Sequence, residues 1–325
     1  MERLISALHL EESDRVPYWE TEINRTIIEY VLGRYAGEST LGMDVKDHIE
    51  LALRIGMDAV GFGIFYSPGR TAKGASEGLI KTWDDIDKLR SEPPDLSKAF
   101  IKLDKYIEAT KDTGLGVWVY THGPLDPVYL GMGLRDFSRK LYSDFKFITT
   151  LMDLILDVQC EIVQEIVKRD IAFFMVGDDV AYKRGLFIRP DVFRRLYPDR
   201  VKRLIKPARD RGIPVLFHSD GKIDDLIPII VDAGVSALHP IEPYSNDIYK
   251  IKEEWGDRLC VVGNVELAGR TPSEIAEDTR EHIRRLADGG YILASSHSVT
   301  NDVKPPGYEA MLKVLHKYGY YERRP

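Results

Sequence analysis

Short apolar runs alternate with longer amphipathic segments along this chain. Each run is rich in branched or aromatic side chains and ends at polar residues or glycine, which is typical of parallel strands covered on both faces. The clearest run is residues 213–218, which leads into His218-Ser-Asp220-Gly221. The same pattern predicts eight strands, at residues 15–20, 57–64, 115–120, 171–176, 213–218, 235–241, 259–262 and 290–297.

The segments between these runs predict helices, because their apolar residues recur at helical spacing. The stretch Thr271-Pro-Ser-Glu274 resembles a capping box with proline in the first turn, so a helix should begin there. The predicted helical segments are residues 1–14, 21–55, 96–112, 137–168 (two helices), 190–211, 222–232, 246–255, 271–287 and 307–318.

Strands that alternate with helices predict an α/β protein, here a single (β/α)8 TIM barrel over residues 1–325 with an N-terminal helical extension. A doubly wound sheet is the main alternative. Polar residues follow nearly every predicted strand, and this favours the barrel, because the carboxyl ends of barrel strands share one open face.

Composition narrows the class of protein. The apolar fraction of 44% and the charged fraction of 30% are ordinary for a globular protein, and a net charge of −7 argues against a nucleic-acid surface. No apolar run approaches the ~20 residues of a membrane span, and the charged N-terminus does not resemble a secretory signal, so we expect a cytoplasmic protein. Cys160 and Cys260 lie in apolar stretches and should be buried free thiols.

Candidate chemistry lies at the ends of two predicted strands. His218 and Asp220 are two residues apart, so on an extended segment they face the same side, and His297 ends the last strand. Two imidazoles and a carboxylate suit zinc. The same histidines could instead act as general bases or substrate hydrogen-bond donors, or could satisfy polar groups at the rim.

Other strand ends supply further candidates. Of the adjacent Asp178 and Asp179, only one should face the barrel mouth; it would act on the substrate or orient a ligand, or would serve as a turn residue. His239, within a strand, should be a packed core residue. The predicted catalytic residues are Asp179, Glu242 and His122, the predicted substrate-binding residues are Tyr18, Trp19, Glu20, Phe65, Tyr66 and Asn264, and the predicted surface histidines are His9, His48, His282 and His316.

Several of these motifs together resemble the uroporphyrinogen decarboxylase superfamily, which implies a single barrel. True decarboxylases of that superfamily carry Arg-Gln-Ala-Gly-Arg near the N-terminus, whereas residues 19–25 here read Trp-Glu-Thr-Glu-Ile-Asn-Arg. Acidic residues stand where a porphyrinogen would need cations. The resemblance is carried by Arg15-Val-Pro, Gly177-Asp-Asp, Arg189-Pro-Asp-Val-Phe-Arg-Arg-Leu-Tyr-Pro, His218-Ser-Asp-Gly, Gly263-Asn264 and Gly290-Tyr-Ile-Leu.

The other branch of the superfamily contains cobamide-dependent methyltransferases. Those that act on coenzyme M carry a zinc motif, His-x-Cys, with a distant cysteine near the last strand. His218 matches the histidine, while Asp220 and His297 replace the cysteines. Harder ligands leave zinc more Lewis acidic, which suits an oxygen substrate better than a thiol.

The resemblance thus implies a methyltransferase that moves a methyl group from a small O-methyl substrate, such as a methoxylated aromatic, to the corrinoid of a partner protein. A decarboxylase of a small acid or porphyrinogen is the alternative enzyme. A third alternative is a binding protein that presents the mouth to a ligand or corrinoid domain. We expect a monomer or homodimer, without nucleic-acid or membrane partners.

Overall fold

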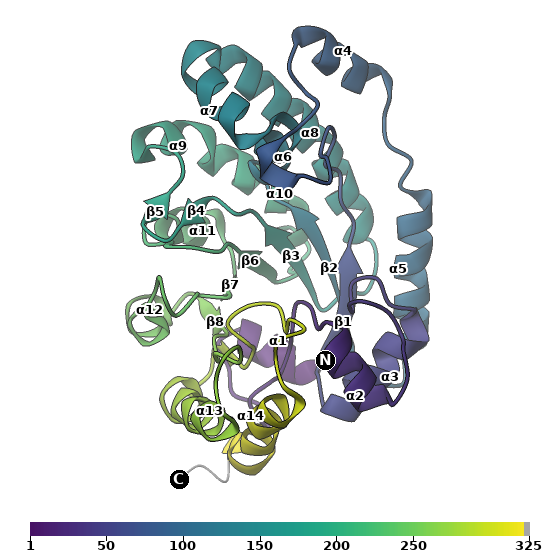
Figure 1. Ribbon diagram of the computed structural model, residues 1–325, viewed down its shortest axis with the longest axis vertical. Helices are drawn as coiled ribbons and strands as arrows, with labels where there is room; N and C mark the ends of the chain where they lie inside the picture. Colours follow the sequence, from purple (N-terminus) through teal and green to yellow (C-terminus); the bar gives the residue numbers. More distant parts are fainter. Residues whose placement is uncertain (322–325) are drawn as a thin grey trace.

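The computed structural model describes residues 1–321, and its centre is a curled parallel sheet (Figure 1). Seven strands lie in the order β1-β2-β3-β6-β7-β8-β9, and every neighbouring pair is parallel. The strands are β1 (Ala59–Gly63), β2 (Gly116–His122), β3 (Phe173–Gly177), β6 (Val215–His218), β7 (Ala237–His239), β8 (Cys260–Val262) and β9 (Tyr291–Ile292).

The predicted first strand is not a regular strand, so the eight-stranded barrel is corrected to a central sheet of seven strands among the described residues. Residues 17–19 still lie between the two edges of the sheet. On one side, Tyr18 forms an isolated parallel bridge with Leu293; on the other, its carbonyl accepts a 2.9 Å hydrogen bond from the Asp58 N–H. The ladder stops there because Pro17 has no N–H and the Tyr18 N–H is taken by the Asp58 carboxylate, at 2.7 Å.

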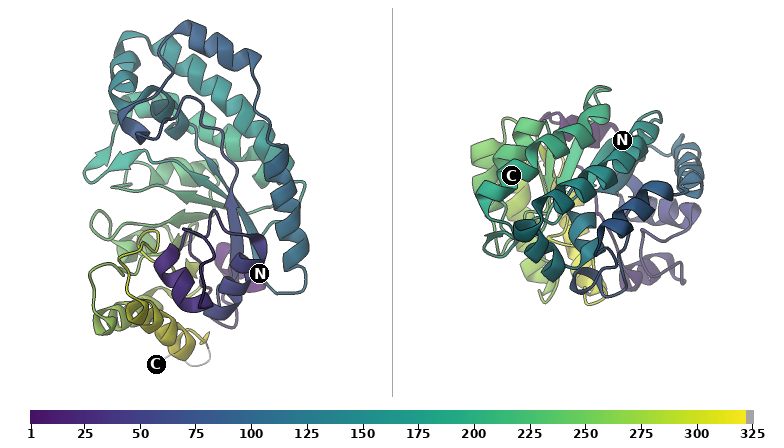
Figure 2. Two further views of the ribbon diagram at one scale, coloured as in Figure 1. Left: turned by 45° about the vertical axis from the view of Figure 1, so that its right-hand side comes forward. Right: turned by 90° about the horizontal axis from the view of Figure 1, so that it is seen from above.

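Helices cover the outer face of the sheet (Figures 1 and 2), and α5, α8 and α10 contact it directly. A two-stranded antiparallel hairpin, β4 (Ala181–Tyr182) with β5 (Gly185–Leu186), follows β3. The helices are α1 (Glu2–Leu8), α2 (Arg25–Leu32), α3 (Val45–Ile55), the 3-10 turn η1 (Gly74–Ser76), α4 (Trp83–Ser91), α5 (Ser97–Thr110), α6 (Asp126–Met132), α7 (Leu134–Ser143), α8 (Phe145–Ile166), α9 (Pro190–Leu196), α10 (Pro198–Arg209), α11 (Ile227–Ala233), α12 (Ile248–Trp255), α13 (Pro272–Leu286) and α14 (Pro305–Tyr318).

Most helices lie where the pattern predicted them, and the differences have local causes. Residues 21–55 hold two helices, because α2 ends at Gly33, whose φ of 71° is left-handed. Residues 190–211 also hold two, since Pro198 begins α10. Helix α6 was missed because all of its residues are buried, so it shows no amphipathic pattern. The capping box at Thr271 and Glu274 is confirmed.

The interior of the curled sheet is packed with alternate residues of the strands. On β2, Trp118 points inward, whereas Val117 and Val119 pack against the helices. The Trp118 ring lies parallel to Phe173 with centroids 6.1 Å apart, and Trp19 meets Trp118 edge-on at 5.2 Å. This layer fills the lower interior, so only the carboxyl ends of the strands above it can form an open site.

The N-terminal helix α1 lies against the same interior. Its buried residues Leu4, Ala7 and Leu8 belong to the cluster formed by the inward-facing strand residues. The predicted helical extension is therefore part of the core of the domain: its apolar side packs against the inward-facing residues of the strands.

Two sequence predictions about burial are corrected. His48 and His282 were expected at the surface but are buried, because each faces the layer between helix and sheet and finds a polar partner there: Tyr106 for His48 and Asn264 for His282. Cys160 and Cys260 are buried free thiols, as predicted.

None of the helices within residues 1–321 combines the length and apolarity that crossing a membrane requires.

The segment that joins the sheet edges is also held by a buried carboxyl group. Glu20 is 3% exposed, and it accepts a 2.6 Å hydrogen bond from the Ser295 hydroxyl and a 3.0 Å bond from the Ser295 N–H. Burial raises the pKa of Glu20 to about 8, although the bonds from Ser295 lower it. The carboxyl group is therefore protonated in the folded protein at neutral pH.

Replacing Glu20 with glutamine should remove part of the pH dependence of stability. Because the folded-state pKa is raised above the ordinary ~4.3 of the unfolded chain, the stabilisation is fully present below that value and is lost as pH rises through the folded-state pKa. Between about pH 5 and pH 8, wild type should lose up to about 1.4 kcal/mol per pH unit relative to Glu20→Gln. Urea unfolding of both proteins across this range measures the difference, and a difference independent of pH would contradict the assignment.

Candidate metal and substrate site at the strand ends

Two adjacent carboxylates after β3 point in opposite directions. Asp178 is fully buried and accepts hydrogen bonds from the N–H groups of Leu125 (3.0 Å) and Asp126 (2.6 Å) and from the Tyr197 hydroxyl (2.7 Å). Burial raises the pKa of Asp178 well above its usual range. Asp178 thus fixes the start of α6, while Asp179 turns toward the loop after β6.

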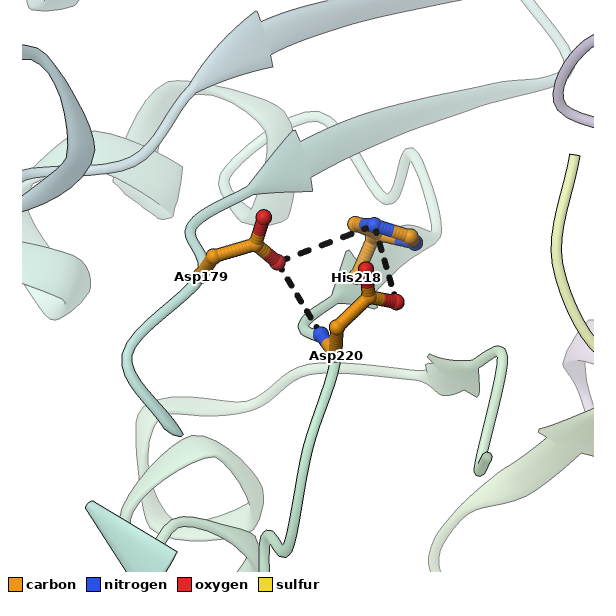
Figure 3. A group of neighbouring side chains, drawn as sticks. All are labelled: Asp179, His218 and Asp220. Carbon is orange, nitrogen blue, oxygen red and sulfur yellow. Dashed lines mark hydrogen bonds and ion pairs between the residues drawn. The ribbon is translucent and has the colours of Figure 1, made fainter. Parts of the chain in front are cut away.

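Asp179, His218 and Asp220 form a compact group of possible metal ligands (Figure 3). One ligand atom from each lies within 4.8 Å of the others. His218 Nε2 is 3.9 Å from Asp179 Oδ1 and 3.8 Å from Asp220 Oδ1, and the Asp220 N–H donates to Asp179 Oδ1 at 3.0 Å. Asp220 Oδ1 is buried and has no hydrogen-bond partner within the described part of the chain. An unpartnered carboxylate oxygen that faces an imidazole nitrogen fits a bound cation.

His297 lies beside this group rather than within it. Its Nε2 is 3.5 Å from Asp220 Oδ2, and its side chain is 55% exposed. The hydrogen bond to Asp220 raises the pKa of His297. Burial alone would raise the pKa of Asp220, but His297 and His218 bring it below its usual value. The sequence grouped His297 with His218 and Asp220; the structure groups Asp179 with them, because β3 is hydrogen-bonded to β6.

Four strand ends stand at one level of the sheet. The parallel register pairs His122 with Gly177, Gly177 with His218, and His218 with His239. Side chains at one level of neighbouring strands share a face, so the three imidazoles point to the inner side of the curled sheet, and Gly177 between two of them has no side chain. A Cβ at Gly177 would lie 2.3 to 2.6 Å from the Tyr120 ring and hydroxyl, so Tyr120 fills the space that a side chain at Gly177 would take.

His239 joins His218 in a buried hydrogen-bonded chain. The two Nδ1 atoms are 2.7 Å apart, and His239 Nε2 is 3.2 Å from the Thr21 hydroxyl oxygen. Burial lowers the pKa of His239 well below its usual value, so the imidazole is neutral. The predicted packing of His239 in the core is confirmed, with Trp19 edge-on at 5.2 Å.

His122 is held by a carboxylate that the sequence analysis did not single out. Its Nδ1 is 3.0 Å from Asp126 Oδ2, and Asp126 also accepts a hydrogen bond from the Tyr129 hydroxyl. The Phe65 ring lies 4.7 Å from the His122 ring and is 40% exposed. The spacing of four residues between His122 and Asp126 was a usable signal, but it required recognition of α6.

Glu242 supports the loop that carries Asp220. Its carboxylate accepts a 2.6 Å hydrogen bond from the Gly221 N–H, and Asn246 Nδ2 donates to the Gly221 carbonyl at 2.8 Å. In the structure, then, Glu242 meets the site through the backbone next to Asp220. Its predicted catalytic role remains a prediction.

Asn264 is buried in the loop after β8, and its side chain faces the loop after β7. Its Nδ2 donates to the Ile241 carbonyl, and its Oδ1 is 2.8 Å from His282 Nε2. It lines a cleft of about 530 Å³ together with residues of α12 and α13.

The other predicted substrate-binding residues differ in exposure. Tyr18 and Trp19 are fully buried, and the Tyr18 hydroxyl is 2.5 Å from that of Tyr308. Tyr66 is 9% exposed, so Phe65 is the aromatic residue of this set with substantial free surface at the mouth.

Comparisons with known proteins agree with this architecture. No curated protein matches the sequence. A methyltransferase from Methanosarcina mazei has a similar structure, with a TM-score of 0.72 at 17% identity over 97% of each chain. A Listeria monocytogenes protein assigned as a vitamin B12-independent methionine synthase gives a TM-score of 0.52 at 10% identity over 94% of this chain and 95% of that one.

The sequence profile described as uroporphyrinogen decarboxylase (URO-D) matches residues 48–318. This span includes β1 to β9 and therefore nearly all of the site residues described above. The chain belongs to the uroporphyrinogen decarboxylase family.

Proposed function

We propose that the protein is a metal-dependent methyltransferase that moves a methyl group from a small O-methyl compound to a corrinoid carried by a partner protein. The observation that carries the proposal is the convergence of Asp179, His218 and Asp220 at the strand ends, with an unpartnered Asp220 oxygen among them. The structural likeness to a methyltransferase from Methanosarcina mazei supports the reaction class.

The donor set fits zinc. One imidazole nitrogen and two carboxylate oxygens leave a coordination position for substrate, and His297 stands next to Asp220 as a further donor. When bound, zinc would supply Lewis acidity to the ether oxygen of the substrate. Without a thiolate in the set, this site suits an oxygen ligand, which is why an O-methyl donor is proposed rather than a thiol.

We place the methyl donor above the Tyr120 ring, which fills the space that a side chain at Gly177 would take. Gly177 lies between His218 and His122, whose strands are two spacings, or about 10 Å, apart. Tyr120 forms the floor, and the exposed Phe65 ring forms a wall beside His122. Two aromatic rings beside the proposed metal ligands suit a flat substrate such as a methoxylated aromatic compound.

His122 is placed to handle the proton of the reaction. When the methyl group leaves, the carbon–oxygen bond breaks, its electron pair stays on the oxygen, and that oxygen must gain a proton. Asp126 holds Nδ1 of His122 and so directs Nε2 away from the α6 side of the ring. An imidazolium held by the buried Asp126 carboxylate can give its Nε2 proton to the departing oxygen while the methyl group passes to the corrinoid acceptor.

A decarboxylase is the second candidate, and the family match favours it. Its usual substrates carry several carboxylates, whereas the mouth here presents Asp179, Asp220 and Glu242. The negative charges of these side chains would repel the carboxylates of such a substrate. Release of carbon dioxide from a carboxylated substrate without any corrinoid would favour this candidate over methyl transfer.

Metal content tests the ligand assignment. Protein purified without chelator and offered zinc should hold about one zinc per chain, and His218→Ala should hold little, because its ring nitrogen is a proposed ligand. Elemental mass spectrometry measures both, with the exposed His9→Ala as the matched control that keeps its metal. Equal zinc in wild type and His218→Ala would refute the assignment.

Methyl transfer to free cob(I)alamin tests the role of His122. Across a panel of methoxylated aromatics, His122→Asn should lower the rate by about 10²- to 10⁴-fold, the usual value of a general acid or base. Zinc content should stay at the wild-type level, because His122 lies two strands from His218. Asp126→Asn should act in the same direction with a smaller loss. Wild-type rates in both variants would exclude proton transfer through this pair.

A further inference from the structure

We infer that His239 is a positioning residue: with Thr21 behind it, its ring accepts the Nδ1 proton of His218 when His218 Nε2 binds metal. This inference rests on the proposed metal site. The sequence indicated a packed core histidine, and its burial alone is consistent with that role. What the packing role does not explain is the direct contact with a proposed ligand.

The contact between the two histidines requires one shared proton. At 2.7 Å between Nδ1 atoms, one ring must donate and the other accept. A neutral imidazole carries one N–H. If the proton is on Nδ1, Nε2 has a lone pair; if it is not, Nε2 carries the proton. Two arrangements are therefore possible for the chain from Thr21 through His239 to His218.

In the first arrangement, His218 Nδ1–H donates to His239. His218 Nε2 then offers its lone pair toward Asp179 and Asp220, and His239 Nε2–H donates to the Thr21 oxygen at 3.2 Å. In the second, the Thr21 hydroxyl donates to His239, His239 donates to His218, and His218 Nε2–H points at the two carboxylates. Both give each of the two hydrogen bonds of the chain a donor and an acceptor, because a hydroxyl can do either. They differ at His218 Nε2, which carries a lone pair in the first and a proton in the second, 3.8 to 3.9 Å from the two carboxylates.

Only the first arrangement is compatible with a cation between Asp179, His218 and Asp220, because a protonated Nε2 cannot be a ligand. His239 is well suited to hold it. Its ring is 2% exposed, lies 5.0 Å from the His218 ring, and is packed against Trp19. A metal-bound histidine commonly donates its other N–H to a carboxylate or carbonyl; here a buried neutral imidazole is the acceptor.

The position of Thr21 connects the hydrogen-bonded chain of Thr21, His239 and His218 to the segment that closes the sheet. Thr21 directly follows residues 17–20, which join the two edges of the sheet and include the buried Glu20. The segment that closes the sheet thus also supplies the last group of the hydrogen-bonded chain. A metal ligand on β6 is thereby oriented through β7 from the N-terminal segment.

Paired substitutions separate orientation from packing. Asparagine at position 239 can place its Oδ1 where Nδ1 accepts, whereas leucine fills similar space without an acceptor. His239→Leu should weaken zinc binding by about 10- to 100-fold, and His239→Asn should recover most of it. Thr21→Val should weaken binding less, and Thr21→Ser should match wild type. Competition with a chromophoric chelator measures the affinities, and thermal unfolding by circular dichroism checks that each variant folds.

The visible absorption spectrum of the cobalt(II)-substituted protein gives a second readout that packing alone would not move. It should change in His239→Leu and stay near the wild-type spectrum in His239→Asn. Wild-type zinc affinity and an unchanged cobalt spectrum in His239→Leu would overturn the inference, as would equal losses in the leucine and asparagine variants. If wild type itself binds no zinc, the proposed function fails, and this inference fails with it.

Discussion

The parallel register of the central strands is the constraint on which the site depends. Because β2, β3, β6 and β7 are paired without a slip at their carboxyl ends, His122, Gly177, His218 and His239 stand at one level. A shift of one residue on any of these strands would turn its end residue to the helix-facing side. The packed aromatic layer below, with Trp118 and Phe173, holds that register, because its side chains are fully buried.

The candidate site also depends on residues 17–21, which join the two edges of the sheet. Residues 17–19 bond to Leu293 and Asp58, Glu20 bonds to Ser295, and Thr21 reaches His239. Five consecutive residues thus link both edges of the sheet to the candidate metal site. The same Asp178 that anchors α6 places Asp126 beside His122, so structural carboxylates orient the groups that face the mouth.

The sequence predicted local features well. Strand cores, the residues at their ends and the divergence of Asp178 from Asp179 follow from alternation along one strand, which needs no knowledge of neighbours. What it could not predict depends on neighbours. The choice of Asp179 over His297 as partner of His218 follows from the adjacency of β3 and β6. The role inferred for His239 follows from cross-strand register, and that of Asp126 from a helix whose full burial hides its periodicity.

Anomalous X-ray diffraction at the zinc edge, on crystals of the zinc-loaded protein, would locate the metal. We expect one strong peak within about 2.0–2.2 Å of His218 Nε2 and of a carboxylate oxygen of both Asp179 and Asp220. We also expect His218 Nδ1 to remain hydrogen-bonded to His239. A peak elsewhere on the protein, or none at the strand ends in zinc-loaded crystals, would contradict the proposed metal site.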